Sequence, residues 1–159
     1  MIDMSDGVVD EFPAVDITCG NILILKSGPD DQVHSVRREF EKKFPHHRDK
    51  LAFHPVRNVN GWKKLCVSHK KIMVITPHLP SNQISADRVA ETVKLANRDA
   101  IVIAWTLVPI KGCNLDANLK RGRQGEEGYN QLLEMFREFF YGVTRDKLID
   151  WLKVKEYTF

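Results

Sequence analysis

Two unbroken apolar runs constrain the fold of this chain more than any other feature. The segments "KKIMVITP" and "DAIVIAW" are rich in β-branched residues and carry only apolar residues at their centres. Strands of this composition are typically buried on both faces, as in a parallel sheet covered by helices. Between them, the spacing of Val89, Val93, Leu95 and Ala96 predicts a helix. Together the two runs predict a β–α–β unit.

The same alternation is found on either side of this unit. "NILILKSGPDD" predicts a strand ended by Gly28 and Pro29, "QVHSVRREFEKKF" predicts an amphipathic helix ended by Pro45, and "KLAFHPV" predicts a short strand. We therefore expect an α/β fold, namely a doubly wound parallel sheet with helices on both faces, of the flavodoxin-like or Rossmann-like kind.

The C-terminal part predicts a long connection and two helices. Residues 107–128 contain glycines and charges and are interpreted as one long connection. An amphipathic helix follows, whose aromatic row is expected to pack against the sheet, and a second short helix comes after a break at Gly142. The row consists of Phe136, Phe139, Phe140 and Tyr141.

Length and composition limit the domain organisation and the environment. With 159 residues, 43% of them hydrophobic, we expect one domain over 21–159, preceded by an acidic arm or edge element over 1–20. Three scattered cysteines, Cys19, Cys66 and Cys113, form no CxxC pair, so we expect reduced thiols and no zinc site. The acidic N-terminus does not resemble a secretory signal, and no apolar run is long enough for a bilayer. We expect a cytoplasmic protein that does not enter the membrane.

The carboxyl ends of the strands are the expected ligand site, because open α/β sheets bind ligands there. Polar, glycine and proline residues follow all four predicted strands, within 27–31, 54–57, 76–80 and 105–109. A metal site is not expected, since the His46–Asp49 cluster lies in a turn after Pro45.

Three segments resemble a known family. The strand ending in "SGP", the strand ending in "HP" and the helix "SADRVAETVKLA" are similar to nucleoside 2-deoxyribosyltransferases and the related 2'-deoxynucleoside 5'-monophosphate N-glycosidases, over about residues 20–110. The helix is also similar to that of NAD-cleaving TIR domains. The resemblance implies that Glu91 is the nucleophile and that Ser85, six positions earlier, contacts sugar or phosphate. It further implies that Gly28 lets the backbone approach the ligand.

The chemistry suits a carboxylate, because loss of the base leaves a sugar cation that an anion can stabilise or capture. The strand before the helix departs from the family pattern, since Thr76 and His78 stand where an aspartate is expected. His78 is the candidate replacement as proton donor, with Asp87 as a second candidate.

The resulting hypothesis is an N-glycosidic-bond enzyme, a deoxyribosyltransferase or hydrolase, that acts on a small-molecule nucleoside or nucleotide without a cofactor. Relatives use C-terminal segments to build dimers, so a homo-oligomer is expected. The catalytic candidates are Glu91 and His78, and the substrate-binding candidates are Ser27, Gly28, Pro29, His54, Ser85 and Asp87.

Two alternatives remain open. The first is a non-catalytic α/β module that binds a nucleotide or a protein partner. The second, less favoured because the net charge of +3 is small, is a nucleic-acid-binding accessory protein. Its basic candidates are Lys63, Lys64, Lys70, Lys71, Arg121 and Arg123.

Overall fold

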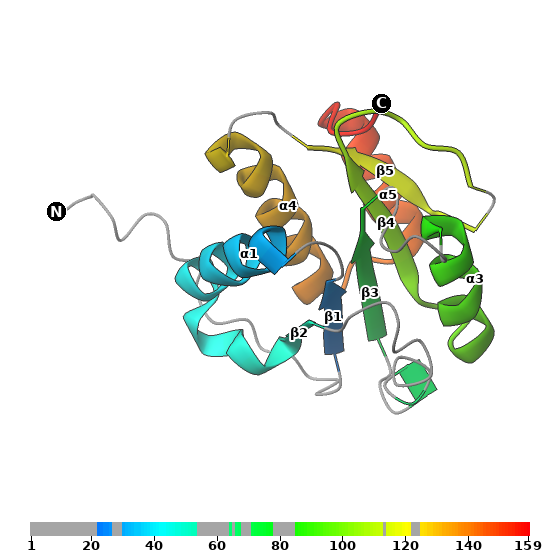
Figure 1. Cartoon of the computed structure of the whole chain (residues 1–159), viewed down its shortest axis with the longest axis horizontal. Coiled ribbons are helices and arrows are strands. Elements are labelled where there is room, and N and C mark those ends of the chain that lie inside the picture. Colours follow the sequence, from blue (N-terminus) through cyan, green and yellow to red (C-terminus); the bar gives the residue numbers. More distant parts are fainter. Residues whose placement is uncertain are drawn as a thin grey trace, which may run out of the picture.

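A computed structural model gives a five-stranded, all-parallel sheet with helices on both faces (Figure 1). It describes residues 22–26, 30–53, 64, 66–67, 71–77, 85–112, 114–121 and 125–159. The strands are β1 (Ile22–Lys26), β2 (Leu51–Phe53), β3 (Lys71–Thr76), β4 (Ile101–Thr106) and β5 (Ala117–Lys120). The helices are α1 (Asp30–Lys43), α3 (Ala86–Ala96), α4 (Gly125–Phe140) and α5 (Arg145–Val154), with a 3-10 helix over Pro45–Lys50.

The strand order confirms the predicted α/β fold. The strands lie in the order β2-β1-β3-β4-β5, which is the flavodoxin-like order of doubly wound sheets. All six residues of β4 and five of the six in β3 are buried. This burial is the physical reason why both strands could be recognised as solid apolar runs.

Two hydrophobic clusters cover the two faces. On one face, Met73, Ile75 and Trp105 pack with the apolar sides of α1, α4 and α5. On the other, Ile72 and Val74 pack with α3 and with Cys66. In Figure 1, α1 and α4 accordingly lie on one side of the sheet and α3 on the other. No helix in the described ranges is long and apolar enough to cross a bilayer.

Three details differ from the sequence-based expectations. The connection over 107–128 was wrongly taken as strandless, because it contains β5. Leu119 is the one buried residue of β5, so this strand gives no apolar run to recognise. Leu95 is 81% exposed, and Tyr141, the last residue of the aromatic row, is half-exposed, whereas Phe136, Phe139 and Phe140 are buried as expected.

The ends of α4 and α5 use the same backbone motif with different residues. Val143 N–H donates to Glu138 O and Gly142 N–H to Phe139 O, which makes a Schellman cap with Gly142 at φ 88°. At the end of α5 the equivalent residue is Glu156, at φ 60°. A side chain is strained in this left-handed region.

These two caps predict opposite effects of reciprocal substitutions. Glu156→Gly should stabilise the protein by about 0.5–1 kcal/mol, because the relief of the left-handed strain exceeds the entropy cost of glycine. Gly142→Ala should destabilise it by about 1 kcal/mol from the backbone alone, since a Cβ there would have no neighbour within 4 Å. Denaturant unfolding of both variants measures this. The prediction is wrong if both substitutions change the free energy of unfolding in the same direction.

His47 is a buried polar residue of the 3-10 helix that lies against Phe140 of α4. Its ring lies 5.2 Å from that of Phe140, and the residue is 7% exposed. Burial, followed by the positive charge of His46, lowers the pKa of His47 below 6.5, while Asp49 acts in the opposite direction.

The lowered pKa predicts a loss of stability in acid. The unfolded chain takes up a proton near pH 6.5 before the folded protein does, so the free energy of unfolding should fall as the pH drops below about 6.5. Urea unfolding at pH 7.5 and pH 5 should show a smaller fall in His47→Asn than in the wild type. The exposed His34 of α1 provides the control, because its charge does not contribute to the shift of the His47 pKa and His34→Asn should keep nearly the wild-type fall. An unchanged pH dependence in His47→Asn would exclude the burial effect.

Candidate functional site

The predicted ligand site is the carboxyl edge of the sheet between β1 and β3. The connection after β1 leads to α1 on one face, and the connection after β3 leads to α3 on the other. Such a reversal leaves a crevice outside the strand ends. Thr76, the last residue of β3, is buried at this edge, and its hydroxyl donates to Pro77 O at 3.2 Å.

Five of the predicted site residues cannot be placed at this edge. Ser27, Gly28 and Pro29 follow β1, His54 follows β2, and His78 lies between β3 and α3; all five lie outside the described residues. Their roles stay predictions. The three that the structure describes, Ser85, Asp87 and Glu91, all belong to the start and middle of α3.

Ser85 is the N-cap of α3. Its side-chain oxygen accepts a hydrogen bond from the backbone N–H of Arg88 at 3.2 Å. N-cap serines satisfy one of the backbone donors that the first turn of a helix leaves without a helical acceptor. A structural role therefore accounts for Ser85, and any contact to a ligand would be additional.

Glu91 lies on the solvent-facing side of α3, together with Arg88 and Leu95. Its side chain is 48% exposed, and Oε1 lies 3.4 Å from Nη1 of the more exposed Arg88. At a rise of about 1.5 Å per residue, Glu91 is roughly 9 Å along the helix axis from Ser85. Ser85 and Glu91 thus share a helix but are not brought together in a pocket.

Asp87 holds the β4–β5 connection against the start of α3. Asn114 donates to its carboxylate twice, from the backbone N–H at 2.8 Å and from Nδ2 at 3.2 Å. Gly112 also lies against this carboxylate, because a Cβ there would be 2.6 Å from Oδ1. The contacts explain why the connection carries a glycine here, and they occupy the group proposed as a second proton donor.

A second set of polar contacts holds the β4–β5 connection in place at the carboxyl edge of the sheet. Asn118 of β5 accepts from the Ile110 N–H at 2.6 Å and donates to the Thr106 hydroxyl at 2.7 Å. Arg121, just after β5, stacks on Trp105, with 5.4 Å between Cζ and the ring centroid. These contacts join the end of β4 to β5 and to the connection between them.

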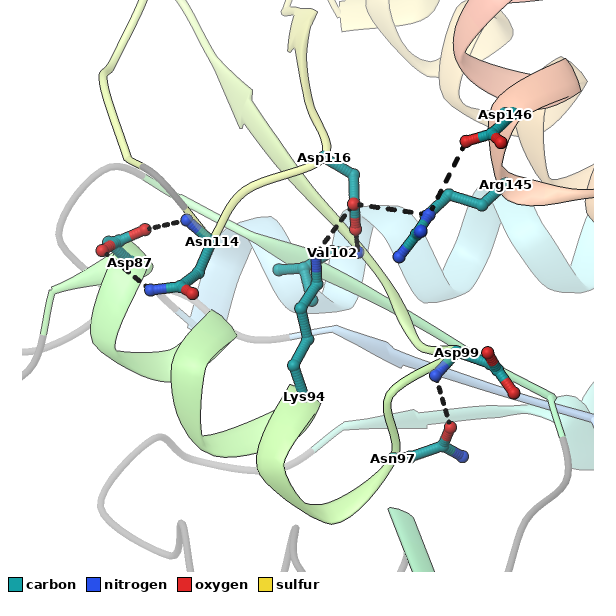
Figure 2. A network of polar contacts seen from close by, with 9 residues as sticks. All are labelled: Asp87, Lys94, Asn97, Asp99, Val102, Asn114, Asp116, Arg145 and Asp146. Atoms are coloured by element: carbon teal, nitrogen blue, oxygen red, sulfur yellow. Dashed lines mark hydrogen bonds and ion pairs between the residues drawn. The ribbon is translucent and has the colours of Figure 1, made fainter.

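The carboxylate of Asp116 contacts three other segments of the chain (Figure 2). Oδ1 lies 2.7 Å from Nζ of Lys94 on α3 and 4.0 Å from Nε of Arg145 on α5, while Oδ2 accepts from the Val102 N–H at 2.7 Å. Its side chain is only 8% exposed. One carboxylate therefore links helices that cover opposite faces of the sheet.

The described residues give little support to a nucleophilic thiol, a nucleic-acid-binding surface or a metal site. Burial raises the pKa of Cys66 to about 11, so this thiol is protonated at neutral pH and a poor nucleophile. Lys71 begins β3, whereas Arg121 follows β5, so these two members of the proposed nucleic-acid surface lie at opposite edges of a parallel sheet. In the part of the chain that is described, no group of three or more His, Cys, Asp or Glu side chains could hold a metal.

Sequence reasoning missed the contacts that organise this region. The pairs Asp87–Asn114 and Lys94–Asp116 join residues 27 and 22 positions apart. The one available signal was the spacing of Asp87 and Lys94. It places both charged side chains on one side of the helix, where a partner segment could be expected. No protein-family model, curated protein or solved structure matches this chain.

Removal of the Asp116 carboxylate should be costly. Asp116→Ala leaves Lys94 and the Val102 N–H without their acceptor, and we expect a loss of about 2–4 kcal/mol in the free energy of unfolding. The matched control is Asp146→Ala, because Asp146 also contacts Arg145 but is 91% exposed. It should cost less than about 1 kcal/mol. Urea unfolding compares the two, and similar losses would show that Asp116 does not organise the fold.

Proposed function

We propose that this protein is a nucleoside- or nucleotide-binding α/β module whose ligand lies at the carboxyl edge between β1 and β3. One observation carries the proposal: α1 and α3 leave neighbouring strands toward opposite faces of the sheet. Doubly wound sheets bind their ligands at this reversal. The nucleoside class rests on the family resemblance of the "SGP", "HP" and "SADRVAETVKLA" segments.

The start of α3 favours a ligand with a phosphate. Its first turn presents backbone N–H groups and the positive end of the helix dipole toward the edge. Arg88, whose side chain is 71% exposed, adds a cation on this turn. The opposing charge of Asp87 is directed instead to Asn114.

A mononucleotide titration tests this proposal. We expect deoxynucleoside monophosphates to shift the backbone amide resonances of Thr76, Ala86 and Thr106 in a saturable manner, with weaker effects from nucleosides that lack the phosphate. Ile101, at the amino edge, should not shift. A titration that leaves the three carboxyl-edge amides unchanged would refute the proposed site.

Cleavage of the N-glycosidic bond is the second candidate function, and one contact favours it. The carboxylate of Glu91, the kind of group that can stabilise a sugar cation, lies 3.4 Å from the guanidinium of Arg88. The reaction would need the sugar to lie over the outward side of α3, where Glu91 is located. Because Glu91 is half-exposed to water, binding without cleavage is the better supported function.

Base release from deoxynucleosides, their monophosphates and NAD separates the two functions. If the protein is only a binding module, the wild type releases no base although the amide shifts are present. If Glu91 is catalytic, Glu91→Gln should lower release at least about a hundredfold. Glu39→Gln is the matched control, because Glu39 makes an equivalent i,i+3 pair with Lys42 at 3.7 Å on α1.

A further inference from the structure

A pocket of about 360 Å³ lies at the amino edge of the sheet, opposite to the edge where α3 begins. It is lined by the first residues of β3 and β4 and by the turn between α4 and α5. Its charged side chains are Lys71, Asp99, Arg145 and Asp146. The volume is within the range of small-molecule sites, about 300–1,000 Å³.

The wall of the pocket is a well-defined turn. The Schellman cap at Gly142 ends α4, and Thr144 begins α5 as an N-cap that accepts a hydrogen bond from the Lys147 N–H at 3.4 Å. Only Val143 separates the capping glycine of one helix from the N-cap of the next. The backbone lining the pocket is thus fixed from both sides, and the first turn of α5 faces the pocket with its positive dipole end.

Both cations of the pocket are held by other parts of the fold. Lys71 donates from Nζ to Phe139 O at 3.1 Å and to Val143 O at 3.3 Å, and its ammonium lies 4.8 Å from the centre of the Phe139 ring. Arg145 is positioned by Asp116 and Asp146, at 4.0 and 3.9 Å from its Nε. A ligand anion would therefore meet cations that are already ordered.

Asp99 supplies a carboxylate of the opposite sign. The hydrogen bond of this residue to Asn97 is made by its backbone N–H at 3.1 Å. Figure 2 shows its carboxylate directed away from Asn97, and within the described chain that carboxylate takes part in no hydrogen bond or ion pair. It is available to accept from a ligand.

We propose that this pocket binds a small zwitterion, that is, a molecule of amino-acid size with one ammonium and one carboxylate group. The carboxylate lies toward Lys71, Arg145 and the start of α5, and the ammonium lies toward Asp99. A simple anion would be repelled by Asp99 and Asp146, and a simple cation by Lys71 and Arg145. Only a ligand with both charges complements the pocket. The inference does not depend on the nucleotide site, which lies at the other edge.

Titration of the full chain with alanine, propionate and ethylamine tests this proposal by amide resonance shifts. We expect alanine to shift Asp99, Gly142 and Asp146 in a saturable manner, with a dissociation constant at least about tenfold lower than that of either singly charged analogue. The expected factor corresponds to the loss of one charge-assisted contact.

Two variants locate the charges. Asp99→Asn and Arg145→Gln should each weaken alanine binding about tenfold, because each removes one charge-assisted contact. Asp150→Asn and Arg38→Gln make the same chemical changes at exposed positions outside the pocket and should leave binding unchanged. The proposal fails if alanine gives no saturable shifts, if propionate binds as tightly as alanine, or if Asp99→Asn binds like the wild type.

Discussion

The structure depends on the burial of β3 and β4 on both of their faces. Successive residues of β3 alternate between two separate hydrophobic clusters, with Met73 and Ile75 in one and Ile72 and Val74 in the other. Because parallel neighbours run in the same direction, each connection must return across a face of the sheet. Covering both faces then requires connections on both sides. The reversal between β1 and β3, and with it the proposed ligand edge, follows from this requirement.

The connection from β4 to β5 meets the same requirement without a helix in its described residues. In Figure 1 it arches over the side of the sheet that carries α3. It contributes one partly buried apolar side chain, Leu115, to the cluster on that face. Polar contacts hold it instead, through Asp87, Asp116 and Asn118. Each such contact contributes about 1 kcal/mol to the free energy of unfolding. Several of them are therefore needed to replace the apolar side of a covering helix.

The sequence predicted those parts of the fold whose signal is local. Each central strand is a solid apolar run, which favours a parallel sheet covered on both faces. The strand order was not predicted, since the consecutive strands β2 and β3 are not neighbours in the sheet. The edge strand β5 was missed because three of its four residues are polar or partly exposed, so its place depends on pairing with β4 and on the bridge from Leu119 to Thr158. The partners of Asp87 and Lys94 lie more than 20 positions away, and the spacing of these two residues indicates only that their side of the helix has a partner segment, not which one.

The spacing of Ser85 and Glu91 is compatible with two explanations, a catalytic role and a role in the stability of α3. A serine that caps a helix, followed six residues later by a glutamate paired with an arginine, is what a helix with one side in water needs for its own stability. A catalytic carboxylate needs more, because it must be shielded from water and held against the reacting sugar. Glu91 is half-exposed to water. Ligand binding at the edge makes a smaller demand on α3, since it uses only the first turn of the helix. That turn is the part of α3 that Ser85 and Asp87 already hold in place.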